Sequence, residues 1–357
     1  MQYLVELISL SVAVSWTAGA IFADVASHRM GSLNLNITRL GFAIIFLAAI
    51  LLIFTGSPVP QNMDARTLFW FSLSGLVGFV FGDWCLFNAY VIFGSLYGQL
   101  LMTLAPIFAG VAGWLMLGER LSSHSLLAMV VTMSGIATTI LSNPEGSRLP
   151  VLKLPLKGVL YGIGAGLGQG VGLVLSKIGI EHYTAAIPAD AAGEITRMMP
   201  FAGTFIRVVT GIIGFAVIIA ARKETAQLRA ALHDRTGMTC TLLTTLAGPV
   251  IGVSLSLKAV QYTSAGIAST LMALTPVLIL FPYSIYSKQK ISGRDASSIL
   301  DNPFREKKDF LDILDDVIRT GHLGPLARHD APRHSDPRQA QNAGKAAETA
   351  PATTDNK

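Results

Sequence analysis

Long apolar stretches separated by short polar connections make up the chain from 1 to 292. A bilayer core about 30 Å thick requires about 20 apolar residues per helix, because backbone polar groups that face lipid must bond within the helix. Nine stretches meet this requirement. They are 4–23, 34–55, 68–92, 95–117, 124–142, 156–178, 198–221, 238–260 and 263–287. The pattern predicts an all-α polytopic membrane protein.

Charged residues divide the chain into an apolar body and a polar tail. The body, 1–292, holds 28 charged side chains, whereas the much shorter tail, 293–357, holds 21. The whole chain is 51% hydrophobic and 14% charged, too apolar for an ordinary soluble domain. This composition argues against a disulfide scaffold, a nucleic-acid module and a compact soluble enzyme. We expect a lipid bilayer around the body, no nucleic-acid partner, and a polar, partly disordered tail that begins with an amphipathic helix near 304–318.

The chain also repeats itself at a constant offset, the one that separates Gly78 from Gly248. Over 75–122 the two copies share ten identities in 48 pairs. Matched glycines and a matched proline within a span are hard to obtain by chance in an apolar sequence. The aligned pairs are Gly78 with Gly248, Gly82 with Gly252, Ala89 with Ala259, Leu101 with Leu271, Met102 with Met272, Leu104 with Leu274, and Pro106 with Pro276. We interpret this as a duplication.

The number of spans in one copy sets the orientation of the other. The first copy, 1–142, contains five spans, an odd number, so the second copy must enter the membrane with the opposite orientation. The second copy, 156–292, contains only four, because the counterpart of the fifth span, 296–312, is too polar to cross a bilayer. The sequence therefore predicts an inverted repeat of 5+4 transmembrane helices, followed by the tail 293–357.

Short motifs in both halves carry a family resemblance. They are Trp16, Arg39, Asn88-Ala89-Tyr90, Thr103-Leu104-Ala105-Pro106, Leu117-Gly118-Glu119-Arg120-Leu121, Ser134-Gly135-Ile136, Lys258-Ala259, Ala273-Leu274-Thr275-Pro276 and Lys288-Gln289-Lys290-Ile291. In order and spacing, over about 3–292, they resemble the EamA-type transporters of the drug/metabolite transporter (DMT) superfamily. The resemblance implies a normally 5+5 exporter or exchanger of small metabolites, with the cavity built by the first four spans of each half. Two departures stand out: Lys288-Gln289 replaces the usual Gly-Glu, and the last span is missing.

Polar groups inside apolar spans point to the functional interior, because they cost several kcal/mol unless they are paired or hydrated. The cavity candidates are Trp16, Asp83, Asn88, Gln99, Gln169 and Lys258. Trp16 is either an apolar wall of the cavity or a side chain packed in the core. Asp83 is either a cavity group or a hydrogen-bond partner of a neighbouring helix. Lys258 is either a cavity cation or a side chain that snorkels to the interface. Arg39 and Arg207 lie near span entrances, where we expect them to anchor the membrane interface, with contact to a substrate as the alternative.

Prolines and glycines mark places where helices bend or approach closely. Pro106 and Pro276 lie within spans and predict either static kinks or hinges at the cavity wall. Glycines occupy every second position of the sixth span, at Gly162, Gly164, Gly166, Gly168, Gly170 and Gly172. On a helix they form two ridges about 160° apart, which favours close packing on two faces or room for a substrate. None of their registers gives a nucleotide-binding G-x-G-x-x-G motif. Cys85 and Cys240 are expected to be buried free thiols, and no metal or cofactor site is expected.

Together these features favour a membrane transporter that works by alternating access around a midplane cavity. No nucleotide site is evident, so we expect exchange of a proton or a counter-substrate to drive it. One alternative is a non-transporting scaffold or an inactive, truncated or frame-disrupted homologue. A minor alternative is an intramembrane hydrolase, suggested by Gly82-Asp83 but lacking an evident second aspartate. We expect no enzyme activity and a bacterial inner-membrane location, and the sequence leaves the oligomeric state open.

The orientation of the termini rests on two conflicting signals. Ten lysines and arginines lie on the side that carries the tail and five on the other, which places the tail in the cytoplasm and the N-terminus outside. The family resemblance instead implies a cytoplasmic N-terminus. We favour the charge count.

Overall fold

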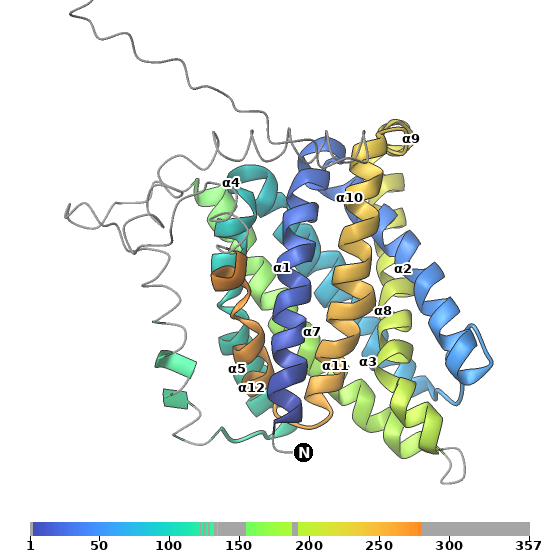
Figure 1. The fold of residues 1–357 in the computed structure, drawn as a ribbon, viewed down its shortest axis with the longest axis vertical. Helices are drawn as coiled ribbons and strands as arrows, with labels where there is room; N and C mark the ends of the chain where they lie inside the picture. Colours follow the sequence, from blue (N-terminus) through green and yellow to red (C-terminus); the bar gives the residue numbers. More distant parts are fainter. Residues whose placement is uncertain are drawn as a thin grey trace, which may run out of the picture. The chain divides into compact units, whose positions relative to one another are not determined.

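The computed structural model describes residues 3–121, 155–187 and 192–279, and a few positions between 123 and 134. The elements in these ranges are helices (Figure 1). The first half contains α1 (Leu4–Met30), α2 (Ser32–Thr55), α3 (Ala65–Gly75), the π-helical segment η1 (Leu76–Asp83), α4 (Trp84–Met102) and α5 (Ala105–Leu117). The second half contains α7 (Leu156–Ala186), α8 (Ala192–Arg222), α9 (Thr225–Ala231), α10 (Arg235–Thr245), the π-helical segment η2 (Leu246–Val253), α11 (Ser254–Val260) and α12 (Ala265–Met272).

Six helices in the described part of the chain are long and apolar enough to cross a membrane. They are Leu4–Met30, Ser32–Thr55, Ala65–Met102, Leu156–Ala186, Ile195–Arg222 and Arg235–Val260, with shorter apolar helices at Ala105–Leu117 and Ala265–Ile279. The prediction of an all-α polytopic membrane protein is confirmed. Most of the predicted fifth span, the end of the ninth and the tail 293–357 lie outside the described residues, so the count of 5+4 spans stays a prediction.

Large apolar side chains lie exposed on the outside of these helices. Ile53 on α2, Leu115 on α5 and Val217 on α8 are examples. In water such side chains would favour aggregation, whereas lipid tails solvate them at no cost. The outer surface therefore suits a bilayer.

The two halves repeat element by element at the offset seen in the sequence. α10, η2 and α11 begin at Arg235, Leu246 and Ser254, the positions that this offset pairs with the starts of α3, η1 and α4 at Ala65, Leu76 and Trp84. Both runs open with an aspartate cap: Asp64 accepts the backbone N–H of Thr67, and Asp234 that of Gly237. π-helical segments are rare, so their occurrence at matched positions is strong support for a duplicated unit. In Figure 1 the run from α3 to α4 ascends while the run from α10 to α11 descends, which is the arrangement of an inverted repeat.

Helix breaks also recur in the two halves. Gly94 divides α4 with φ 85° and ψ 170°, a conformation that side chains with a Cβ rarely adopt. α4 then ends at Met102 and α5 begins at Ala105, with Pro106 in its first turn. In the second half α12 ends at Met272 and the chain is helical again over 275–279, around Pro276. Since proline has no N–H to continue the ladder, each proline starts a new segment.

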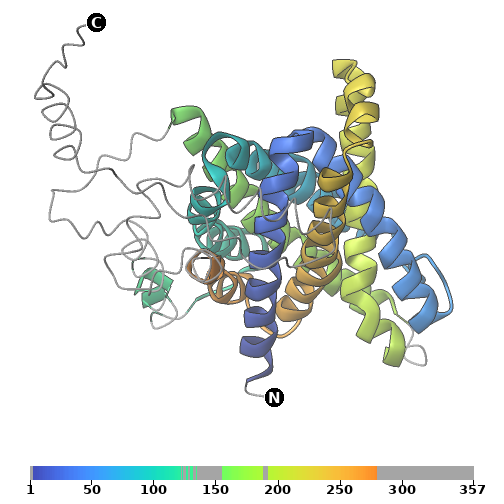
Figure 2. The same cartoon turned by 45° about the horizontal axis from the view of Figure 1, so that its top comes forward.

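Each half sends its first helix into the other half. α1 packs against α10, η2, α11 and α12, while α7 packs against α3, η1, α4 and α5. The Ser74 hydroxyl donates to the Gly172 carbonyl at 2.6 Å, and Thr244, its counterpart in the repeat, donates to the Gly19 carbonyl at 3.4 Å. α2 lies beside α8 (Figures 1 and 2). The centre of the bundle is therefore built by both halves.

Candidate functional site

Two adjoining cavities lie between the halves of the bundle. Both are lined by Trp16 of α1, Gln99 and Met102 of α4, Gln169 of α7 and Val253 of η2. They hold about 550 and 520 Å³ of space not filled by atoms, part of which is open to solvent.

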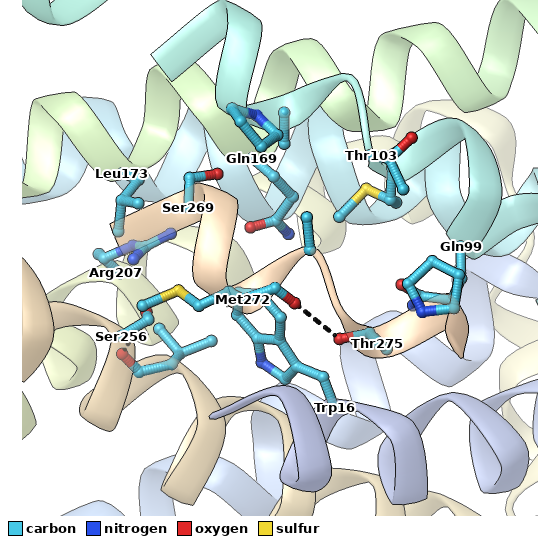
Figure 3. A pocket seen from close by; sticks show the side chains of 16 residues that line it. Trp16, Gln99, Thr103, Gln169, Leu173, Arg207, Ser256, Ser269, Met272 and Thr275 are labelled. Carbon is cyan, nitrogen blue, oxygen red and sulfur yellow. Dashed lines mark hydrogen bonds between the residues drawn. The ribbon is translucent and has the colours of Figure 1, made fainter. Parts of the chain in front are cut away.

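The first cavity is enclosed by the broken helices of the two halves (Figure 3). Pro106 and Pro276 both line it. Where α12 breaks, the Thr275 hydroxyl donates to the Met272 carbonyl at 3.0 Å, so a side chain satisfies a backbone group that the helix leaves open. The structure thus brings both prolines to the cavity wall, at discontinuities that the sequence predicted as kinks or hinges.

The second cavity contains a buried ion pair. An Arg39 Nη atom donates to the Asp83 carboxylate at 2.5 Å, and the Gln169 amide donates to the other carboxylate oxygen at 2.7 Å. Asp83 is 3% exposed and Arg39 4% exposed. Asp83 therefore does both things that the sequence left open, since it lines a cavity and also bonds to two neighbouring helices.

Arg207 projects from α8 into the first cavity. It is 2% exposed, and its guanidinium lies over the ring of Phe79 at 4.9 Å from the centroid. Arg39 lies 5.8 Å from the centroid of the same ring. The expectation that both arginines anchor the membrane interface is wrong. The hydropathy pattern places Arg207 near the start of its span, but α8 begins at Ala192, so Arg207 lies in the middle of the helix.

Trp16 and Gln99 complete the shared wall of the cavities. The Gln99 amide donates to the Tyr90 hydroxyl at 2.5 Å. The Trp16 indole packs on Gly252 so closely that a Cβ there would lie 2.4 Å from Nε1. Glycine at 252 is therefore what allows an indole to fill the gap between α1 and η2.

Asn88 and Lys258 do not line either cavity. The Asn88 amide donates to the Trp84 carbonyl of its own helix at 2.6 Å. The Lys258 ammonium lies 5.2 Å from the centroid of the Tyr262 ring, at the end of α11. The repeat matched these two positions to each other, but the structure does not bring them to the site.

The six glycines of α7 lie at two helix contacts. Gly164, Gly168 and Gly172 face Cys85, Gly82 and Gly78, whereas Gly162, Gly166 and Gly170 face Leu101, Ala105 and Ala109. A Cβ on Gly168 would lie 2.4 Å from the Cα of Gly82, and one on Gly170 would lie 2.5 Å from the Ala105 carbonyl oxygen. Because the nearest atoms are backbone, a side chain there would force the helices apart.

Two ion pairs join the halves at opposite ends of the run from α10 to α11. Arg29 of α1 donates to Asp234, which precedes α10, at 2.8 Å. Beyond the other end of the run, Lys177 pairs with Glu119 and donates to the Thr263 carbonyl at 2.9 Å. Glu119 also accepts the backbone N–H of Ala265 at 3.3 Å. The sequence places these charges in loops or at the end of a predicted span and does not indicate their partners, because nothing local does so.

Asp24 is a buried carboxylate that the sequence did not single out. It accepts the backbone N–H of Ser95 at 3.3 Å and the Ser95 hydroxyl at 3.1 Å, directly after the break at Gly94. The predicted first span ended at residue 23, one position earlier, and so left Asp24 out. Only the observed length of α1 places it inside the bundle.

The described residues contain no cluster of His, Cys, Asp and Glu that could hold a metal ion. Cys85 and Cys240 are both buried. The site in this part of the chain therefore consists of amides, hydroxyls, an aromatic wall and two arginines with one carboxylate.

The family model for EamA-like transporters matches residues 4–141 and again 156–300. The chain belongs to the EamA-like transporter family. It is a membrane transporter by fold, and its family is one of transporters and not, in general, of enzymes. The fold of this EamA-like protein implies that it lies in a lipid bilayer and acts on a small-molecule substrate. No curated protein shows significant sequence similarity to it.

Seventeen solved chains are similar to this EamA-like protein. One, a crystal structure described only as that of a protein, aligns with a TM-score of 0.55 at 13% identity, over 88% of this chain and 96% of the other. At this identity the likeness supports the fold alone.

Proposed function

We propose that this EamA-like protein carries small organic metabolites across the membrane by alternating access, as an exporter or exchanger. The observation that carries the proposal is the pair of cavities, whose walls come from α1 and α4 of one half and α7 and η2 of the other. A site shared by two inverted halves can open to either side when one half rocks against the other.

The ion pairs at the two ends of the bundle suit such a movement. Arg29 with Asp234 and Glu119 with Lys177 each join one half to the other. Opening to one side requires one pair to separate while the other holds. Exchange of a proton or a counter-substrate would supply the driving force, and a bacterial inner membrane is the setting that the family resemblance suggests.

Transport by purified protein in proteoliposomes tests the proposal. The panel should contain radiolabelled amino acids, nucleobases, organic acids and cationic drugs, each with an inward and an outward gradient. We expect saturable transport of at least one class. Absence of transport throughout, beside an active family member with ten spans, would instead favour a non-transporting scaffold or an inactive homologue.

Cross-linking tests the mechanism separately. In a background with Cys85→Ala and Cys240→Ala, cysteines replace Arg29 and Asp234 in one variant and Glu119 and Lys177 in another. A flexible bismaleimide that links either pair should stop transport, and the unlinked variants should retain it. Full transport with one end linked would contradict alternating access.

A further inference from the structure

Among the residues that the structure describes, Arg207 is a buried cation with no carboxylate in an ion pair with it. Its Nε atom is also buried and has no hydrogen-bond partner in this part of the chain. In Figure 3 its guanidinium is turned toward the side of the cavity where Gln169 and Ser269 lie. A buried charge left in this state costs several kcal/mol, so it usually indicates a role in function.

The end of the π-helical segment differs in charge between the two halves. In the first half Arg39 pairs with Asp83, the last residue of η1. The last residue of η2, at the matched position, is Val253, which lines both cavities but cannot accept a hydrogen bond through its side chain. Each half has a buried arginine in its second helix, Arg39 in α2 and Arg207 in α8, and only the first half supplies a carboxylate at the end of its π-helical segment.

The charges that line the two cavities therefore do not cancel. Two guanidinium groups, of Arg39 and Arg207, lie on the ring of Phe79, and one carboxylate, of Asp83, lies with them. Asp83 already accepts hydrogen bonds from Arg39 and Gln169. Among the described residues that line the two cavities, arginines therefore exceed carboxylates by one, and the guanidinium without a carboxylate in an ion pair is that of Arg207, which borders the first cavity.

We propose that the substrate of this site carries an anionic oxygen group, a carboxylate or a phosphate, and that Arg207 binds it in the first cavity. This inference rests on the function proposed above and narrows its substrate class. A guanidinium offers a planar fork of donors that matches two oxygens of such a group. The amide of Gln169 and the hydroxyl of Ser269 line the same cavity and serve the neutral part of the molecule.

The same geometry selects against other substrates. A cation in the first cavity would meet Arg207 at close range, and the described residues that line this cavity include no carboxylate to offset the repulsion. A neutral molecule would leave the arginine uncompensated. Discrimination therefore arises from repulsion as well as from attraction.

Binding to the purified full-length protein tests this inference without requiring transport. Succinate with its neutral diamide, and glycerol 3-phosphate with glycerol, serve as matched probes in calorimetry. We expect binding of at least one anion and not of its neutral analogue, and the two pairs distinguish carboxylate from phosphate. Arg207→Gln should weaken that binding roughly 30-fold or more, whereas Arg207→Lys should retain part of it.

Val253→Asp provides an independent test that does not remove a buried residue's charge. It supplies the second half with the carboxylate that Asp83 supplies to the first, so it should neutralise the charge of Arg207. The melting temperature should stay the same or rise, and the affinity for the anionic probe should fall roughly 30-fold or more. Val253→Asn is the matched control for size and polarity and should retain binding. Equal anion binding by Val253→Asp and Val253→Asn would overturn the inference, as would tighter binding of the neutral probes or no binding of either anion.

Binding and transport experiments together distinguish a failure of the anion site from a failure of the proposed transport function. An anion that binds through Arg207 but is never transported in proteoliposomes would support the anion site and contradict the transporter. Transport of neutral or cationic compounds, with no anion bound, would support the transporter and contradict the anion site.

Discussion

Val253 ends η2 at the position that matches Asp83, the last residue of η1, in the repeat. At these two positions the halves differ in charge, although η1 and η2 start and end at matched residues. The first half balances its buried arginine with a carboxylate, and the second half presents its arginine to a cavity.

The pair of Arg39 and Asp83 should contribute to stability through its burial. Asp83→Asn keeps the size of the side chain but leaves Arg39 uncompensated, so we expect a loss of about 3 kcal/mol in the free energy of unfolding. The double variant Arg39→Met, Asp83→Leu removes both charges and should recover most of that loss. Chemical unfolding in detergent measures both. A single variant as stable as the wild type would contradict the ion pair.

The contact between Gly168 and Gly82 leaves no space for a methyl group. Gly168→Ala should therefore cost about 1–3 kcal/mol, because backbone must move to admit the Cβ. Gly41 is the matched control, since a Cβ on this helical glycine meets nothing within 4 Å. Gly41→Ala should be neutral or stabilise by up to about 1 kcal/mol. Similar melting temperatures for the two variants would show that α7 does not pack as tightly as described.

The two ion pairs between the halves should differ in strength. Lys177 and Glu119 are 16% and 15% exposed, whereas Arg29 and Asp234 are 36% and 24% exposed. Glu119→Gln should cost about 1–3 kcal/mol, since the remaining ammonium is largely buried. Asp234→Asn should cost roughly 1 kcal/mol or less. Unfolding in detergent compares the two, and the reverse order would contradict the described burial.

Acid should weaken the contact at Asp234. Partial burial opposes ionisation, but the hydrogen bond and charge of Arg29 and the Gly237 N–H outweigh it and hold the pKa of Asp234 below its ordinary value. A lowered carboxyl pKa stabilises the fold above the unfolded-state pKa, about 3.9, and this contribution is lost as the pH falls below it. The melting temperatures of wild type and Asp234→Asn should therefore converge below about pH 4. A constant difference from pH 7 to pH 3 would rule out this role.

Much of the fold could be predicted because membrane helices and repeats leave local signals. Apolar runs gave the helices, and the constant offset between the copies gave the matching of α3, η1 and α4 with α10, η2 and α11. Pro106 and Pro276 indicated the breaks at the cavity. These features depend on residues close in sequence or on identity between the copies.

The arrangement of charges could not be predicted in the same way. The pairing of Arg39 with Asp83 joins helices that are distant in sequence, and no local pattern shows that Arg207 lacks an ion pair among the described residues. Span limits drawn from hydropathy put both arginines at the membrane surface and left Asp24 outside. Asn88 and Lys258 were chosen for polarity alone, and polarity does not indicate which way a side chain turns.

Alternating access requires the first cavity, which both halves line, to open in turn to the two sides of the membrane. A cysteine at Ser269, on the wall of the first cavity, tests it in the background without Cys85 and Cys240. A buried cysteine at Ser9, outside both cavities, is the control. In sealed right-side-out and inside-out vesicles, a membrane-impermeant maleimide should label Ser269→Cys from both sides and Ser9→Cys from neither. Labelling of Ser269→Cys from one side only, or from neither, would contradict the account.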